Sequence, residues 1–230
     1  MQTELISCLG TDLTVVNAAR VSFDKESDWE VNHSVRKELS SKDAALIRYL
    51  AKHNHFTPFT HCMITLRETI PIFVARQRFK HTIGFSYNEV SRRYVDDTPE
   101  FYTPDTWRGK ADNAKQGSSE KEIDINPTIQ GIPPASPALV DVYQHALKTC
   151  KWTYEKLLDK GVCPEQARMV LPQSMYTSYY VTGSLSAFAR AYKLRIDKHA
   201  QKEIQELAEK WNAIIKDLYP VSWEALTNGE

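Results

Sequence analysis

Glycine is scarce in this 230-residue chain, and its spacing constrains the fold more than any other sequence feature. Only eight glycines occur, and no two lie within four residues of each other. The turns of Rossmann dinucleotide-binding folds and of P-loops need closely spaced glycines, so both are excluded. The chain also has no Gly-x-Ser-x-Gly elbow of the hydrolase kind. Any dinucleotide must therefore be bound without a Rossmann turn.

Length, charge and cysteine content predict one intracellular globular domain. At 230 residues and 42% hydrophobic content the chain can bury a core. Its formal net charge of zero argues against bulk attraction to nucleic acid or anionic lipid. Four scattered cysteines without a Cys-x-x-Cys pair are typical of reduced thiols. With no signal peptide and no apolar run long enough to span a bilayer, we expect a cytoplasmic protein without membrane or nucleic-acid partners.

Hydrophobic periodicity predicts a helix-rich α+β fold. Ser40 and Asp43 fit a capping box at the start of the first clear helix. The predicted helices span 41–53, 138–160, 185–194 and 200–218, and the predicted strands 62–69 and 175–182. Shorter helices are expected to open at Pro71 and to run from Pro164 to Leu171. The sum is a small central sheet flanked by helices.

The stretch from Thr103 to Pro137 follows neither periodicity. It contains three of the eight glycines, and four prolines lie between Pro127 and Pro137. Such a composition is typical of a long surface loop. We therefore expect residues 1–230 to form a single domain with an irregular insertion at about 103–137.

Positive charge gathers with hydrogen-bonding side chains between Arg76 and Tyr94. This segment holds five arginines and lysines, together with His81, Asn88, Glu89 and two serines. Guanidinium groups bind phosphate oxygens in pairs, and hydroxyl and amide groups complete such a site. The alternative interpretation is a solvated basic helix face followed by a turn.

Two further arginines stand in apolar surroundings. Arg168 is flanked by alanine, methionine and valine, and Arg195 follows an apolar helical segment near its end. A buried guanidinium must find an anion or several acceptors, because an unpaired internal charge is costly. Such an anion is either a ligand or an internal carboxylate. The candidate carboxylates are Glu165, Asp197 and Glu203.

The histidines and cysteines give weaker signals. His53, His55 and His61 resemble a metal cluster only in residue type, since no acidic or cysteine ligand stands at a supporting spacing. Capping or hydrogen-bonding roles are favoured instead, and no metal is expected. Cys62, beside His61, lies in an apolar strand pattern that favours a buried thiol over a nucleophile.

An ordered series of motifs resembles flavin-dependent thymidylate synthases. The clearest is Ser-x-Asn-x-x-Ser-x-Arg, which is present from Ser86 to Arg93. Further similar segments lie, in the family's order, at 18–23, 53–61, 71–77, 167–172 and 194–201. The resemblance covers nearly the whole chain apart from 103–137.

The chain departs from the family pattern at the flavin-contacting triplet. The family's Arg-His-Arg appears here as Lys-His-Thr at residues 80–82, with one extra residue before Ser86. Lysine still holds a phosphate as a point charge, but threonine cannot replace a guanidinium fork. Arg76 and Arg78 are candidates to compensate. Two asparagine positions that serve the flavin in the family are Ser184 and Arg190 here.

The resemblance implies a homotetrameric enzyme with FAD sites built from several subunits. NADPH would reduce FAD, 5,10-methylenetetrahydrofolate would supply the carbon, and dUMP would become dTMP without a metal or a cysteine nucleophile. Arg195 matches the catalytic position. A guanidinium near N3 and O2 of uracil favours the anion that makes C5 nucleophilic, because an adjacent opposite charge shifts a pKa by about 1–3 units.

The remaining residue roles also follow from the resemblance. The positions that match nucleotide contacts are Gln77, Lys80, Glu89, Ser91, Arg92, Arg93, Arg168 and Arg195. Those that match flavin contacts are Thr57, Lys80, His81, Thr82, Glu89, Ser184 and Arg190. His55 lies where folate and flavin meet. Arg93 is assigned to the phosphate, and Ser91 is a hydrogen-bond donor because no base is visible to activate it.

Three rival hypotheses remain at this point. The first is a related flavin- and folate-dependent methylase or hydroxymethylase of another pyrimidine nucleotide. The second is a structural tetramer that has lost activity, which the altered triplet allows. The third is a non-enzyme, in which Arg76–Tyr94 is a basic, aromatic-studded strip for single-stranded nucleic acid. The zero net charge counts against the third.

Overall fold

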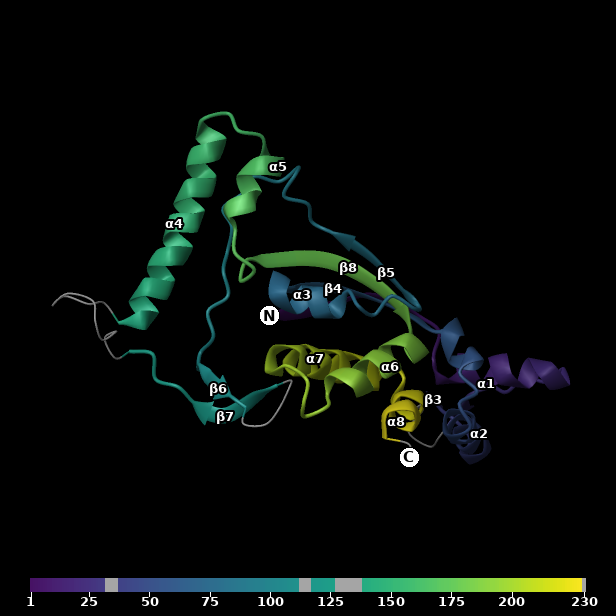
Figure 1. Ribbon diagram of the computed structural model, residues 1–230. Helices are drawn as coiled ribbons and strands as arrows, with labels where there is room; N and C mark the ends of the chain where they lie inside the picture. Colours follow the sequence, from purple (N-terminus) through teal and green to yellow (C-terminus); the bar gives the residue numbers. More distant parts are fainter. Residues whose placement is uncertain (32–36, 112–116, 127–137, 229–230) are drawn as a thin grey trace. The chain divides into compact units, whose positions relative to one another are not determined.

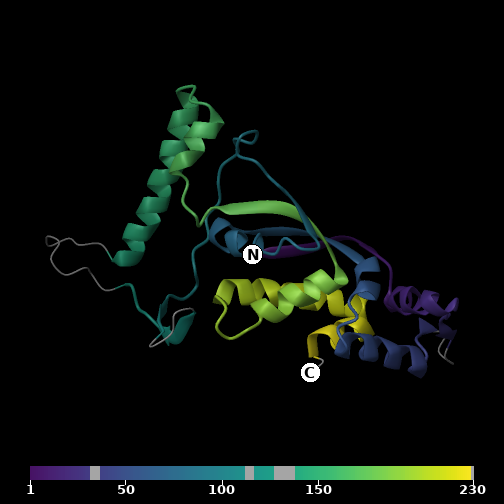
Figure 2. The same ribbon diagram turned by 45° about the vertical axis from the view of Figure 1, so that its right-hand side comes forward.

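The computed structural model describes residues 1–31, 37–111, 117–126 and 138–228. Its contacts divide the chain into two compact units, which are treated separately below. The first unit comprises Met1–Glu68, Arg78–Asn88 and Tyr179–Glu230, and the second unit comprises Thr69–Gln77 and Glu89–Ser178. Figures 1 and 2 show the ribbon from two directions.

A four-stranded sheet has the strand order β1-β4-β8-β5. The strands are β1 (Gln2–Leu9), β4 (Met63–Pro71), β5 (Phe85–Glu89) and β8 (Tyr176–Ser184). The Thr65 hydroxyl hydrogen-bonds that of Thr182, and the Thr69 hydroxyl donates to that of Ser178. Because residue numbers rise along one strand as they fall along the other, β4 and β8 are antiparallel. The predicted α+β class is confirmed.

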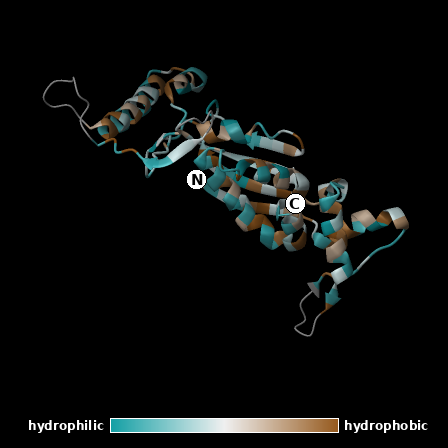
Figure 3. Ribbon diagram, turned by 60° about the horizontal axis from the view of Figure 1, so that its bottom comes forward, coloured by the Kyte–Doolittle hydropathy of each residue, from teal (hydrophilic) through white to brown (hydrophobic). Residues whose placement is uncertain are grey.

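Strand alternation places one face of the sheet in the core of the first unit. Ile64, Leu66 and Glu68 are fully buried, whereas the residues between them are partly or fully exposed. Helices α6 (Leu185–Arg195) and α7 (Lys202–Leu218) lie side by side along the sheet in both ribbon views. Figure 3 shows hydrophobic and hydrophilic residues mixed along the helices, as expected of helices with one buried face.

The rest of the first unit joins the two ends of the chain. It contains α1 (Asp12–Arg20), η1 (Val21–Phe23), β2 (Glu30–Val31), β3 (Lys37–Glu38), α2 (Ser41–Lys52), η2 (Thr57–His61) and α8 (Pro220–Asn228). The Asp12 carboxylate accepts hydrogen bonds from the backbone N–H groups of Val221 and Ser222. It thereby caps α8, since the first turn of a helix leaves donors unpaired. The predicted Ser40 cap of α2 is confirmed by its bond from the Asp43 N–H.

The second unit contains the longest helix, α4 (Leu139–Asp159), which confirms the predicted helix at 138–160. α5 (Pro164–Ala167) and η3 (Arg168–Val170) pack against it. Within the stretch predicted to be irregular, β6 (Arg108–Lys110) and β7 (Ser118–Glu122) form an antiparallel hairpin. Residues 112–116 and 127–137 of that stretch lie outside the described residues.

The structure departs from the predicted elements in three ways. The helix expected to open at Pro71 is α3 (Ile72–Arg78), because Pro71 still belongs to β4. The helix expected at 164–171 is a short α5 followed by the 3-10 turn η3. The sequence interpretation missed β1, α1, β5 and α8 altogether. Among the described helices, none is long and apolar enough to cross a membrane.

Candidate active site

The main polar cluster of the first unit joins the loop after α3 to the last turn of α6. The Nε of Arg195 donates to Nε2 of His81 at 2.8 Å. His81 is 7% exposed, and its backbone is held by Tyr87, whose hydroxyl donates to the His81 carbonyl at 2.7 Å. Two residues predicted for different ligands, His81 for flavin and Arg195 for the nucleotide, therefore contact each other.

Positive charge surrounds the His81 imidazole. Burial comes first among the causes that lower the pKa of His81 from 6.5 to about 4, followed by the charges of Arg195, Arg78 and Arg190. Burial also lowers the pKa of Arg195, with a smaller contribution from Arg78. The imidazole is therefore neutral at physiological pH and can accept the Arg195 hydrogen bond.

Two glycines allow the loop to approach α6 closely. Gly84 has φ +78°, and a Cβ there would lie 2.9 Å from the Ala187 Cβ. A Cβ on Gly183 would lie 2.4 Å from the Phe85 ring. The loop that carries the extra residue therefore lies directly on the end of β8 and the first turns of α6.

Other predicted flavin residues lie on or beside this loop. Lys80 and Thr82 flank His81 and are exposed. The Arg190 guanidinium, also exposed, donates to the Ile83 carbonyl from α6. Ser184 is buried, and its hydroxyl accepts from the Ala187 N–H as the N-cap of α6. Ser184 therefore has a structural partner already.

Arg78 does not compensate for the altered triplet, because its side chain points into the core. It is fully buried and forms an ion pair with Glu68, with Nε 3.3 Å from Oε2. Glu68 also accepts from the Tyr179 hydroxyl and, at 2.9 Å, from Trp211 Nε1. The Phe85 and Trp211 rings each lie 4.5 Å from the guanidinium carbon.

His55 and Thr57 follow the C-terminus of α2 in the first unit. Both are exposed, and the His55 ring lies edge-on to Tyr49 with centroids 6.1 Å apart. Thr57 opens η2, which packs against α6. The His53 ring is tilted by 45° against that of Tyr49, with centroids 4.3 Å apart. No cluster of three metal-binding side chains occurs in the described parts of the chain.

In the second unit, predicted nucleotide residues continue from the end of β5. Glu89 accepts from the Thr177 hydroxyl at 2.6 Å. The Ser91 hydroxyl accepts from Nε of Arg93 at 3.3 Å, and Arg92 pairs with Asp97 at 2.5 Å. The exposed Arg93 thus contacts the neighbouring hydroxyl that was predicted to share its ligand. Gln77 lies in the last turn of α3.

Arg168 differs from its expected environment. The apolar neighbours suggested a buried guanidinium, but Arg168 is exposed on η3, and its Nε donates to the backbone carbonyl of Glu165 at 3.3 Å. The apolar pattern is satisfied by Ala167, which is fully buried. Of the carboxylate residues considered as alternatives to a ligand, Glu165 contacts Arg168, but through its backbone carbonyl.

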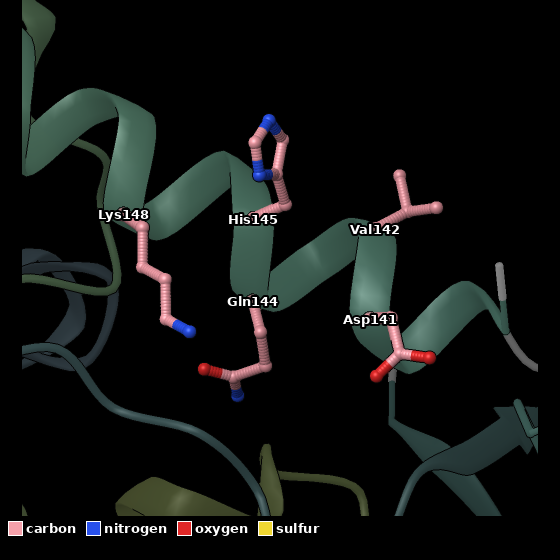
Figure 4. A pocket seen from close by; sticks show the side chains of 5 residues that line it. All are labelled: Asp141, Val142, Gln144, His145 and Lys148. Atoms are coloured by element: carbon pink, nitrogen blue, oxygen red, sulfur yellow. The ribbon is translucent and has the colours of Figure 1, made fainter.

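Two of the surface hollows formed by described residues lie along helices α4 and α7. One follows an exposed side of α4 (Figure 4), where Val142 and His145 project to one side and Asp141, Gln144 and Lys148 to the other. Another is lined mainly by polar residues of α7. Neither contains a residue predicted for a ligand. Cys62 is fully buried, and burial raises the pKa of its thiol to about 12, which agrees with the structural role predicted for it.

Sequence reasoning missed two residues that organise the cluster, Glu68 and Tyr87. Glu68 occupies a core-facing position of β4, and a carboxylate there must be paired. That position, followed ten residues later by an arginine, was a usable signal. The role of Tyr87 depends on β5, which was not predicted.

Comparison with known proteins finds similarity over nearly the whole chain. Residues 4–221 match the family described as "Thymidylate synthase complementing protein". The flavin-dependent thymidylate synthase of Thermosipho melanesiensis is 38% identical over 221 residues, 96% of this chain and 88% of that protein. The chain belongs to the flavin-dependent thymidylate synthase family. It is thus an enzyme of dTMP biosynthesis that uses a flavin, and the predicted function is confirmed.

Two further proteins are similar to this chain. The flavin-dependent thymidylate synthase of Thermus thermophilus is also 38% identical, over 96% of this chain and 73% of that protein. A solved structure of the UMP/dUMP methylase PolB from Streptomyces cacaoi, bound with 5-Br dUMP, has a TM-score of 0.76. It is 30% identical and covers 99% of this chain and 94% of that chain. Membership decides against the non-enzyme hypothesis.

Proposed function

We propose that this enzyme methylates dUMP to dTMP with FAD as its flavin, NADPH as reductant and 5,10-methylenetetrahydrofolate as carbon donor. The observation that supports the proposal is the fixed guanidinium of Arg195, at the end of α6 and bonded to His81 at 2.8 Å. A rigidly placed cation is what the first chemical requirement of the reaction calls for.

That requirement is a nucleophilic C5 on an electron-poor pyrimidine. Arg195 stabilises the negative charge that appears on N3 and O2 when the N3 proton leaves, so electron density moves towards C5. A neighbouring cation favours the anion by about 1–3 pKa units, or roughly 1.4 kcal/mol for each unit. No covalent protein nucleophile is needed, in agreement with the buried Cys62 thiol.

The donors around loop 80–84 fit a flavin dinucleotide. FAD carries a diphosphate, which needs cations and hydrogen-bond donors, and exposed Lys80 and Arg190 supply both. Arg190 reaches the Ile83 carbonyl, one residue after the threonine that replaces the family's arginine. We therefore assign to Arg190 the guanidinium that position 82 lacks. When bound, the flavin supplies the hydride chemistry, and the protein orients it.

The nucleotide contacts are assigned residue by residue. Arg93 and Arg168 hold the phosphate and the nucleotide, Ser91 donates a hydrogen bond, and Gln77, Glu89 and Arg92 complete the polar surroundings. His55 and Thr57 serve the folate and flavin. We propose that the enzyme works as a homotetramer, with each FAD site completed by neighbouring subunits, and that residues 1–230 act as one functional domain.

UMP is a second candidate substrate. The likeness to PolB, described as a UMP/dUMP methylase and also solved with 5-Br UMP, favours this alternative. The two substrates differ only by the ribose 2′-hydroxyl. Higher identity to thymidylate synthases, 38% against 30%, favours dUMP. Competition between equal concentrations of UMP and dUMP distinguishes the two, because a 2′-hydroxyl that finds no partner in the site weakens binding.

Product formation from dUMP tests the proposal. The complete mixture should give dTMP, and omission of FAD, NADPH or methylenetetrahydrofolate should stop it. Arg195→Ala should abolish tritium release from C5-labelled dUMP, whereas Arg48→Ala, an exposed arginine paired loosely with Glu224 at 3.8 Å, should not. Full tritium release by the Arg195 variant would remove this residue from the mechanism.

A further inference from the structure

The hydrogen bond between His81 and Arg195 requires a neutral imidazole, because the ring nitrogen must accept it. Nε of a guanidinium can only donate, so Nε2 of His81 must be the acceptor at 2.8 Å. Its proton then lies on Nδ1. This tautomer orients Arg195 without cancelling its charge, because the acceptor is uncharged.

The bond also decides which part of the guanidinium can meet a ligand. A guanidinium can bind a ligand through either of two pairs of N–H groups. One pair combines Nε with a terminal nitrogen, and the other combines the two terminal nitrogens. Since Nε donates to His81, a ligand of Arg195 must be met by the terminal NH groups. The imidazole therefore determines which edge of the Arg195 guanidinium faces a ligand.

Two elements hold the backbone of His81, and a third contacts its imidazole. The His81 N–H donates to the Arg78 carbonyl at the end of α3, and the Tyr87 hydroxyl of β5 donates to the His81 carbonyl. The Arg78 side chain donates to the same Tyr87 hydroxyl at 2.6 Å. From α6, Arg195 closes the cluster. The fixed backbone places the imidazole beside α6, and a rotamer change of His81 would leave Arg195 Nε without this acceptor.

The charges that face His81 keep it in the accepting form. Arg78 acts from α3, Arg190 and Arg195 act from α6, and all three are cations. Protonation of the His81 imidazole would be opposed by each of these three cations and by burial. The accepting form is therefore maintained across the neutral pH range.

We propose that His81 is a positioning residue for Arg195, and that it sets the edge which Arg195 presents to the pyrimidine. The proposal rests on the role assigned above to Arg195. It gives His81 a function different from direct contact with the flavin. The two functions can be tested separately, because substitutions of His81 can move or remove the hydrogen-bond acceptor at Nε2 while FAD content is measured independently.

Three substitutions of His81 separate these functions. His81→Gln places an amide oxygen near the position of Nε2, so it can still accept from Arg195, and it does not titrate. His81→Asn places its amide near Nδ1, too short to reach. His81→Phe keeps the ring and removes the acceptor. His145→Phe, an exposed histidine on α4, is the matched control (Figure 4).

The readouts are tritium release from C5-labelled dUMP and FAD content of the purified holoenzyme. His81→Phe and His81→Asn should lower the rate of release about 10- to 100-fold with FAD content unchanged, as expected for a misplaced catalytic group. His81→Gln should remain within about threefold of the wild-type rate. Comparable loss in the Gln and Phe variants, or unchanged release in the Phe variant, would overturn the proposal. So would loss of FAD in all three.

A double substitution tests whether His81 acts through Arg195. dUMP affinity, measured by calorimetry, should fall in His81→Phe and in Arg195→Ala, but the two effects should not add. Additive losses would show independent roles and contradict the proposal. If Arg195→Ala retains full tritium release, the proposed role of Arg195 fails first. If it is inactive while His81→Phe is fully active, only the inference about His81 fails. Should His81→Phe not fold, the contrast between Gln and Asn decides.

Discussion

Arg78 and Arg195 belong to the same unit and act on the same histidine, but their guanidinium groups have different partners. Arg78 is fully buried and paired with Glu68, among the rings of Phe85 and Trp211. Arg195 is only partly buried, and its Nε is bonded to a neutral imidazole. The Arg78 guanidinium has a carboxylate as its counter-ion, whereas the Nε of Arg195 donates to an acceptor that carries no charge.

The difference separates a structural cation from a chemical one. A buried ion pair is costly to break, because removal of one partner leaves an uncompensated buried charge. A cation oriented by an uncharged acceptor keeps its field available to a ligand. Changes at Arg78 should therefore alter stability, whereas changes at Arg195 should alter the reaction.

The largest effect should follow from breaking the buried pair. Glu68→Gln removes the charge of the carboxylate and leaves one accepting oxygen in place of the two that accept from Tyr179 and Trp211. Arg78 then remains buried without a counter-ion, which should cost about 3–5 kcal/mol in the free energy of unfolding. Urea denaturation followed by circular dichroism measures this loss.

The matched control removes both charges. Glu68→Gln combined with Arg78→Met should recover most of the loss, because replacing both members of a buried pair is often close to neutral. A loss below about 1 kcal/mol in Glu68→Gln alone would mean that the pair does not organise this core.

The next largest effect concerns pH and stability. Since the pKa of His81 is lowered from 6.5 to about 4, the unfolded chain binds this proton more readily than the folded one. The free energy of unfolding should therefore fall as pH decreases from 6.5 to about 4, by up to about 3 kcal/mol from this group. Above 6.5 the contribution is complete.

His81→Gln isolates this contribution from that of other titrating groups. The variant should lose less stability than the wild type over that pH range, although both contain the same carboxylates. Identical pH profiles for the two proteins would show that His81 is not held in its neutral form by the fold.

A comparable effect, now on the reaction, is expected from Arg195→Lys. Lysine keeps the positive charge but has neither the Nε–H that donates to His81 nor the planar fork. The rate of C5 tritium release should fall about 100-fold, while the free energy of unfolding changes by less than about 1 kcal/mol. Arg78→Lys should show the reverse pattern. Equal losses of stability in the two variants would remove the distinction between them.

The sequence predicted those parts of the fold whose signals are local. The helices at 41–53, 138–160 and 185–194 have periodic apolar faces and caps, and the structure contains each of them within two residues of the predicted ends. β1 and β5 were missed because their residues are mostly exposed, so no alternating core face marks them. Their existence depends on pairing with β4 and β8, which lie far away along the chain.

The site shows the same division between local and distant information. The motifs named most of the residues, but the contact between His81 and Arg195 joins positions 114 residues apart. The core position of Arg78 could not be read from a run of basic residues, because it depends on Glu68 in a different element. The exposure of Arg168 was mispredicted because apolar neighbours in a short helix need not share its face.

The smallest effect on stability is expected at Arg168, which makes the comparison with Arg78 sharpest. Its side chain is exposed and bonded only locally, to the Glu165 carbonyl, in the contacts described above. Arg168→Ala should change the free energy of unfolding by less than about 0.5 kcal/mol, as for most surface sites. If Arg168 binds dUMP, its loss removes a charge-assisted hydrogen bond worth about 1.5–3 kcal/mol, which weakens binding by 10- to 100-fold. Calorimetry with dUMP, beside Arg48→Ala as the exposed control, measures that change, and unchanged affinity would contradict the assignment. Arg168 should thus affect ligand affinity and not stability, whereas Arg78 should affect stability and not ligand affinity.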